Sequence, residues 1–129
     1  MSFNDDLHRF NELVRERAIQ RMRRVALKAA TEIIRGTPVD TGVACGNWRV
    51  GLGAFSREYD PSLKDRDGKE TIRKASAIIA TATPGVDIYI TNSVPYIVQL
   101  EHGYSPQQPG GWVHNTVNKI RLEIAAGRL

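Results

Sequence analysis

A long run without glycine or proline constrains the fold of this chain most. The run extends from about Asn4 to Arg35 and is rich in Arg, Ala, Leu and Glu, which are all good helix formers. Asn4, followed by two aspartates, is a helix start signal, and Gly36 with the nearby Pro38 is a stop signal. We therefore predict one long N-terminal helix over residues 4–35.

Apolar residues recur along this helix at three- and four-residue steps. This spacing places them in one stripe on one face of the helix. We expect the stripe to be buried. Its members are Phe3, Leu7, Phe10, Val14, Ala18, Met22, Val25, Ala29 and Ile33.

A second set of residues on the helix is basic. Arg17, Arg21, Arg24 and Lys28 lie at helical spacing and form what we call the basic ridge. One interpretation is a solvated face; the alternative is contact with an acidic neighbouring subunit or with the phosphates of DNA. The whole chain has 18 Lys and Arg against 14 Asp and Glu, a net charge of +4. This balance suits an acidic partner but is common in proteins without one.

Beyond the long helix, short strands and helices follow one another. The patterns predict strands at 47–53 and 87–92, helices at 69–82, 95–101 and 112–126, a polar loop at 56–68, and a further strand between 54 and 59. Trp48 is the predicted core anchor of the first strand. We predict a single α+β domain over 1–129, with the long helix and a body of about 37–129. In it, a small, mainly antiparallel β-sheet is packed by helices and a C-terminal helix.

The residues that could carry chemistry form no recognised site. His8, His102 and His114 lack the spacing of metal ligands, and a single cysteine, Cys45, provides neither a zinc framework nor an intrachain disulfide. We therefore assign no metal and no cofactor.

A hydrolase is a distant alternative. It would use Cys45 or Ser105 as nucleophile, His102 as base, and Asp40 or Glu101 to orient the base, but neither nucleophile lies in a recognised local frame. We assign no catalytic residue and expect a protein that is not an enzyme.

The sequence also bears on the compartment. No stretch approaches the roughly 20 apolar residues that span a bilayer, and the first residues lack the basic and apolar regions of a signal peptide. We expect a soluble protein without a membrane partner that is not exported by the usual route.

Two groups of turn residues occur in a characteristic order over about residues 30–120. The motifs are Thr37-Pro38-Val39-Asp40-Thr41-Gly42, Asn47-Trp48, Ile90-Thr91-Asn92, Pro95-Tyr96, Leu100-Glu101-His102-Gly103, Ser105 and Gln108-Pro109-Gly110. In this order and spacing they resemble the tail-component family of long-tailed bacteriophages. This family includes the tail-completion or neck proteins related to minor tail protein Z.

The resemblance implies a structural virion protein made in the host cytoplasm. It would assemble as a ring of six copies at the head–tail junction, between the tail terminator and the head-side connector, with transient DNA contact in the channel. Two alternatives stay open: a tail terminator at the end of the tail tube, and a basic nucleic-acid-binding module that uses the basic ridge.

Two sets of residues are candidates for roles in such a protein. The segment around 104–112, rich in glycine and proline with aromatic residues at its margins, is a candidate subunit interface. Its residues are Tyr104, Pro106, Gln108, Pro109 and Trp112. We expect the signature residues to set turns and fill the core rather than to contact a partner; they are Pro38, Asp40, Gly42, Trp48, Pro95, Tyr96 and Gly103.

Overall fold

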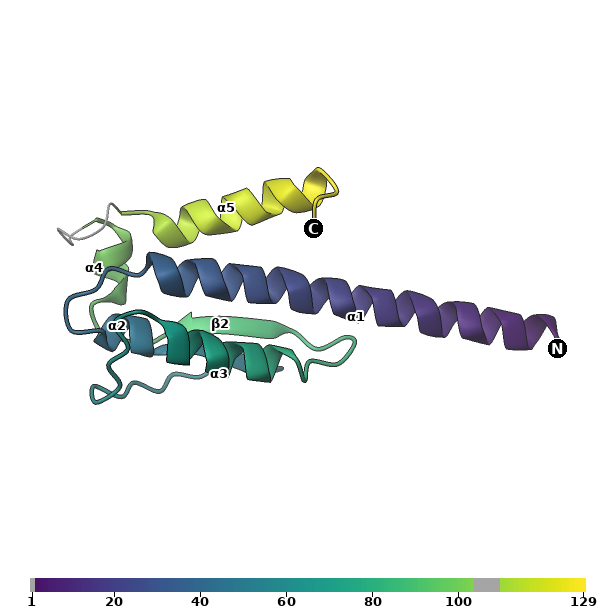
Figure 1. Ribbon diagram of the computed structural model, residues 1–129, viewed down its shortest axis with the longest axis horizontal. Coiled ribbons are helices and arrows are strands. Elements are labelled where there is room, and N and C mark those ends of the chain that lie inside the picture. The colour runs from purple at the N-terminus through teal and green to yellow at the C-terminus, as the bar shows by residue number, and fades with distance from the viewer. Residues whose placement is uncertain (1, 104–109) are drawn as a thin grey trace.

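The computed structural model describes residues 2–103 and 110–129 and has an α+β architecture (Figure 1). The predicted fold class, a long N-terminal helix and a small antiparallel sheet packed by helices, is confirmed. In chain order the elements are α1 (Phe3–Gly36), α2 (Val43–Gly46), β1 (Trp48–Leu52), α3 (Lys69–Ile79), β2 (Ile88–Asn92), α4 (Ile97–Glu101) and α5 (Trp112–Ala125).

Helix α1 begins at a capping box. The Asp5 N–H donates to Ser2 Oγ, and the Ser2 N–H donates to Asp5 Oδ2, each over 3.2 Å. These bonds satisfy backbone donors that the helix leaves unpaired at its first turn. The helix ends at Gly36, and Thr37 takes an extended conformation before Pro38. The predicted long helix is thus confirmed.

The sheet consists of two antiparallel strands. Trp48 is paired with Asn92, and Val50 with Ile90. The predicted strand between 54 and 59 is wrong, because these residues are irregular. The chain leaves the sheet at Gly53, which has a φ of 76° and donates its N–H to Asp87 O over 2.8 Å.

The core lies between α1, α3 and the sheet. Trp48 packs against it as predicted, and its indole N–H donates to Thr37 Oγ1 over 2.8 Å, so this half-buried ring has its polar atom satisfied. The buried cluster consists of Ala26, Ala30, Ile34, Cys45, Ala75 and Ile79, with Leu27, Val50, Ile72, Ile88 and Ile90 against it.

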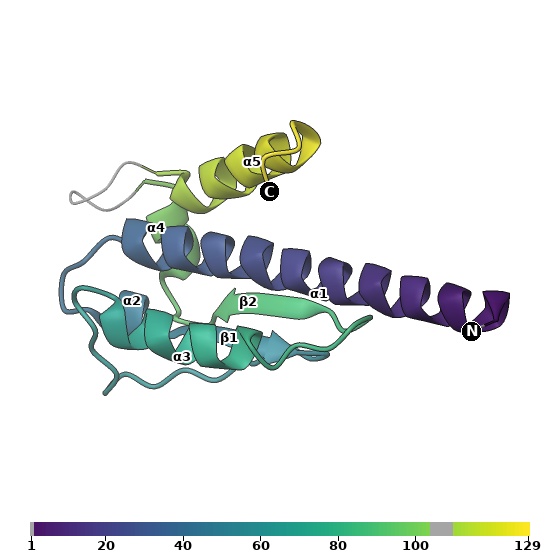
Figure 2. The ribbon, with the colours of Figure 1, turned by 45° about the vertical axis from the view of Figure 1, so that its right-hand side comes forward.

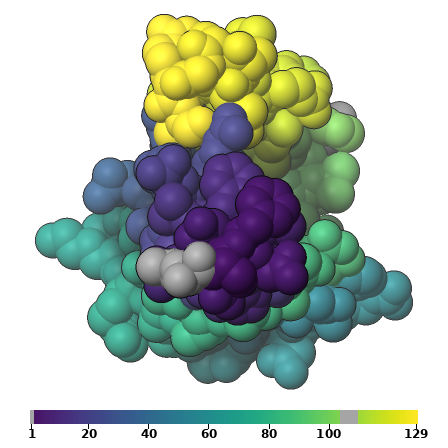
Figure 3. Space-filling view, turned by 90° about the vertical axis from the view of Figure 1, so that its right-hand side faces the viewer, coloured from purple at the N-terminus to yellow at the C-terminus, as the bar shows by residue number. Residues whose placement is uncertain are grey.

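Helix α5 covers the opposite side of α1 from the sheet and α3 (Figures 1 and 2). Seen end-on, α1 lies between the C-terminal layer and the body (Figure 3). Trp112 joins these layers: its side chain is only 6% exposed, and its indole N–H donates to Ile33 O over 3.0 Å. A Cβ at Gly36 would lie 2.8 Å from the Trp112 ring, so the glycine makes room for the tryptophan.

The N-terminal half of α1 extends beyond both layers (Figures 1 and 2). Here the prediction of a buried stripe is wrong: Phe3 is 78% and Phe10 61% exposed. The body is shorter than the helix, so no element of the described chain covers this end. We call its exposed apolar side chains the apolar tip; they are Phe3, Leu7, Phe10, Leu13 and Val14.

In the second half of α1, the buried face of the helix differs from the predicted apolar stripe. Of its members only Ile33 is buried, while Ala18 is exposed and the others are half-buried. The body packs against a neighbouring face of the helix instead. The buried residues of α1 are Ile19, Ala26, Ala30, Ile33 and Ile34.

Candidate functional site

The first turn motif of the resemblance, residues 37–42, connects α1 to the body and has a structural role. Gly42 has a φ of 91°, and its carbonyl accepts hydrogen bonds from the N–H groups of Gly46 (2.9 Å) and Asp65 (3.0 Å). A Cβ at this glycine would lie 2.8 Å from Asp65 N, so both its conformation and its surroundings require glycine. Pro38 is buried, in agreement with the expected turn and core role.

Asp40 is exposed and contributes to the turn through its backbone. Its carbonyl accepts a hydrogen bond from Arg66 Nη1 over 2.6 Å. The side-chain oxygen that accepts from the backbone ahead is Thr41 Oγ1, which lies 3.4 Å from Val43 N. The side chain that caps this turn is therefore that of Thr41, not that of Asp40.

Asn47 connects the turn to the polar loop that follows β1. Its side chain is fully buried, at 0% exposure. The amide nitrogen donates to Val43 O (2.8 Å) and Asp60 O (2.9 Å), and the amide oxygen accepts from Asp60 N (2.9 Å). A buried polar group so well paired stabilises one arrangement of the chain, because losing a partner leaves unsatisfied groups.

The motif at the end of β2 also holds neighbouring backbone in place through side-chain hydrogen bonds. Asn92 Nδ2 donates to Ala44 O over 2.8 Å, and its Oδ1 accepts from Val94 N over 3.0 Å. Pro95 and Tyr96 are exposed, so these two signature residues do not fill the core. Gly103 has a φ of 91° and closely approaches Gly110.

Glu101 binds the start of α5. Its carboxylate accepts from the N–H groups of Val113 (3.1 Å) and His114 (2.9 Å). A carboxylate at a helix N-terminus pairs unsatisfied donors and complements the helix dipole. Glu101 therefore has a structural partner and is not oriented toward a catalytic histidine.

The basic ridge is divided by α5. Lys28 Nζ lies 2.6 Å from Glu123 Oε2, and this hydrogen bond holds the pKa of the Glu123 carboxyl below its usual value. Arg21 Nε donates to Leu129 O over 2.9 Å. Arg17 and Arg24 are exposed. The ridge is thus only in part a free electrostatic surface.

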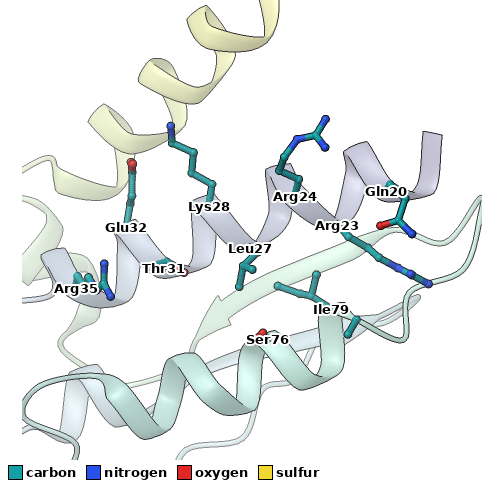
Figure 4. Close-up of a pocket in the computed structure, with 11 residues that line it drawn as sticks. Gln20, Arg23, Arg24, Leu27, Lys28, Thr31, Glu32, Arg35, Ser76 and Ile79 are labelled. Carbon is teal, nitrogen blue, oxygen red and sulfur yellow. The ribbon is translucent and has the colours of Figure 1, made fainter. Parts of the chain in front are cut away.

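Two residues of the basic ridge and two further basic residues line a groove between α1 and α3, which we call the basic groove. It has a volume of about 620 Å3. Leu27 and Ile79 point toward each other across it, whereas the Arg24 side chain points away from α3 (Figure 4). Its cations are Arg23, Arg24, Lys28 and Arg35.

Sequence reasoning missed two of these cations. Arg35 follows Lys28 by seven residues, a helical spacing that could have placed it on the ridge. Arg23 has no such signal, because its guanidinium position depends on the segment that follows α3: Nε and Nη2 donate to Ala82 O over 3.1 and 2.6 Å.

Cys45, one of the two candidate nucleophiles of the hydrolase alternative, lies in a setting that does not suit catalysis. Cys45 is buried, and its thiol donates to Ile34 O over 3.5 Å. Burial, with smaller contributions from the charges of Asp65 and Asp67, raises the pKa of the Cys45 thiol to about 11. The thiolate that acts as a nucleophile is therefore scarce at neutral pH. His102 is exposed beyond α4, and Ser105 lies outside the described residues.

Within residues 2–103 and 110–129, no cluster of three His, Cys, Asp or Glu side chains is placed to hold a metal ion. In the same part of the chain, no helix combines the length and apolar character needed to cross a membrane.

The predicted subunit interface is corrected at one residue. Trp112 packs inside the chain against α1, because Gly36 leaves space for its ring, so it is not an exposed anchor. The other members, Tyr104, Pro106, Gln108 and Pro109, lie outside the described residues.

Comparison with protein-family models, with curated proteins and with solved structures found no match to this chain. The arrangement of its own side chains therefore carries the functional argument. Two surfaces stand out on α1: the uncovered apolar tip and the basic groove.

We predict that Asn47→Ala lowers the free energy of unfolding by about 3 kcal/mol, since three hydrogen bonds of about 1 kcal/mol each are lost. Asn118→Ala, which removes a half-buried amide whose Nδ2 lies 3.0 Å from Nε2 of the exposed His114 on α5, is the control, and we expect it to change stability by less than about 0.5 kcal/mol. Urea denaturation of both variants measures the difference. Equal small effects would show that Asn47 does not anchor the loop.

Proposed function

We propose that this chain is a structural component of the virion of a long-tailed phage. In this proposal it is a tail-completion or neck protein that assembles as a ring of six copies and joins the tail terminator to the head-side connector. The ordered turn motifs support the proposal through their resemblance to the tail-component family, and the apolar tip supports it through its exposure.

The apolar tip is the observation that carries the proposal. Phe3 and Phe10 are 78% and 61% exposed, which leaves about 280 Å2 of aromatic side chain in water if each ring has about 200 Å2 to bury. Leu7, Leu13 and Val14 enlarge this surface. The largest apolar patch on a typical monomer is about 300–600 Å2 and is often functional, and larger patches mark sites of association.

The positions of the signature residues fit an assembly protein. Gly42, Asn47 and Asn92 use their hydrogen bonds to hold loops against the core rather than to surround a substrate. These loops fix the body against the C-terminal half of α1, and the N-terminal half projects from it (Figure 1). A rigid body with a projecting amphipathic helix is suited to contact neighbouring subunits.

Cryo-electron microscopy of intact particles of the source phage tests the proposal. We predict a ring of density at the head–tail junction into which this fold can be placed, with the apolar tip covered by a neighbouring chain. Particles assembled without the chain are the control and should lack that ring. Junction density explained entirely by other proteins would contradict the neck role, and a ring at the end of the tail tube would favour a tail terminator.

The basic groove favours a second candidate, a contact with nucleic acid. Its lining contains four cations and one acidic residue, Glu32, which is paired with Lys119 over 3.2 Å. Two of the cations are engaged within the chain, Lys28 by the Glu123 carboxylate and Arg23 by Ala82 O, whereas Arg24 and Arg35 are exposed. Arg24 and Arg17 are exposed on the same helix and could reach phosphates, which bind such residues without regard to sequence.

For this candidate we predict weak binding of duplex DNA that falls with added salt. Arg17→Gln combined with Arg24→Gln removes two phosphate contacts and should reduce the slope of log affinity against log salt by about 1.8. Lys64→Gln combined with Lys74→Gln removes the same charge from exposed positions outside α1 and is the control. Absence of binding at low salt, or equal losses in both variants, would remove this candidate.

A further inference from the structure

A second apolar surface lies between α1 and β2. On α1 it continues the predicted apolar stripe from the apolar tip toward the body. We call it the lateral groove, and its volume is about 540 Å3. Arg21 and Asp87 are its charged residues. Its apolar lining consists of Ala18, Met22, Val25, Ala26, Val86, Ile88 and Ile90.

We propose that the apolar tip of one copy of this chain lies in the lateral groove of a second copy. This contact would be the interface between neighbouring copies, and it rests on the proposed function for its place in a ring. It accounts for seven of the eight members of the predicted apolar stripe that the chain itself does not fully bury: Phe3, Leu7, Phe10 and Val14 in the tip, and Ala18, Met22 and Val25 in the groove.

The dimensions of the two surfaces agree. Ala18 and Ala26 mark the length of the groove on α1, about 12 Å at 1.5 Å per residue. In the tip, Leu7 to Val14 spans about 10 Å by the same measure and presents Leu7, Phe10 and Val14 at alternating three- and four-residue steps. Two turns of the tip therefore fit the groove, as amphipathic helices do in apolar grooves.

The tip and the stretch of α1 that contains the groove have opposite net charges, although the two charged residues that line the groove itself, Arg21 and Asp87, balance each other. Residues 3–14 contain three acidic residues, Asp5, Asp6 and Glu12, against one arginine, Arg9, which gives −2 with histidine neutral. The part of α1 beside the groove, residues 15–24, contains five arginines against one glutamate, which gives +4. Asp87 on the opposite wall reduces this excess to +3. An acidic tip is therefore attracted to the groove region and a basic one would be repelled.

A tip cannot fill the groove of its own chain. Both belong to α1, which is one continuous helix over Phe3–Gly36, so the tip projects away from the residues that line the groove (Figure 2). The occupant must be another molecule, and a second copy presents a surface of the required shape and charge. Contact between two different surfaces of identical chains is head-to-tail, and such contacts close into rings when the rotation allows.

Disulfide trapping with the full chain tests this contact. Phe10→Cys places a thiol in the tip and Val86→Cys places one in the groove; the native Cys45 is buried with a thiol pKa of about 11 and stays out of the reaction. The two variants carry tags of different size, are mixed in equal amounts and are oxidised with glutathione disulfide. We expect a mixed dimer to form at least tenfold faster than in the control mixture.

The control mixture pairs Val86→Cys with Glu12→Cys, because Glu12 is exposed on the tip but lies two residues from Phe10, on the far side of the helix. Equal rates in both mixtures would overturn the proposal. A Phe10→Cys homodimer as the main product would also overturn it and would indicate a symmetric pairing of tips. Absence of any dimer at several hundred micromolar protein would likewise overturn the proposal.

A second measurement guards against misfolded variants. Leu7→Ser with Phe10→Ser should weaken self-association at least tenfold in sedimentation experiments, while helical circular dichroism is retained. Arg9→Ser with Glu12→Ser changes two residues to serine without changing net charge and should associate like the parent chain. Equal association of both variants would contradict the contact.

These results and the particle structure can disagree in informative ways. A trapped tip–groove dimer from a chain that is missing from the head–tail junction would retain the contact and reject the virion role. A chain located in the junction whose tip lies outside the neighbouring groove would retain the role and reject the contact.

Discussion

The packing of small side chains on the C-terminal half of α1 decides how the rest of the chain is arranged. Ala26 and Ala30 are buried and allow the sheet and α3 to approach the helix closely. On another side of the helix, Gly36 makes room for Trp112, which holds α5 in place. Larger residues at these sites would force the layers apart, because protein cores are close-packed. One helix thus supports both layers over half its length.

In this arrangement, the residues that stabilise the fold differ from the residues that we propose to contact partners. The buried amide of Asn47, the carbonyl of Gly42 and the carboxylate of Glu101 all satisfy backbone groups of neighbouring loops. The surfaces that we propose for recognition lie along α1, as an apolar tip, a lateral groove and a basic groove. A protein built in this way contributes shape and adhesion to an assembly, which is the role that we propose.

Much of the fold could be predicted from local signals in the sequence. The run free of glycine and proline predicted α1, and alternating residues around Trp48 and Ile90 predicted the two strands. Burial was harder to predict, because periodicity shows that a helix has an apolar face but not how far a partner reaches along it. Phe3 and Phe10 follow the same period as Ile33, yet the body ends before it reaches them.

The site could be predicted only in part, since several contacts depend on residues far apart in the sequence. Trp112 lies beside a segment rich in glycine and proline, and this context predicted an exposed interface residue. Its burial depends instead on the space that Gly36 leaves for the ring. The spacing of Lys28 places it in the basic ridge, but in the structure Glu123 of α5 pairs with it. The lateral groove likewise exists only where β2 lies beside α1.

Hydrogen exchange measured by mass spectrometry at low and high protein concentration tests the central claim most directly, namely that one half of α1 is held by its own chain and the other by a second copy. We predict that amides of residues 26–34 are protected at both concentrations. Amides of residues 5–14 should exchange rapidly in dilute solution and become protected as the concentration rises. Protection of residues 5–14 in the dilute monomer, or rapid exchange there at every concentration, would contradict the account.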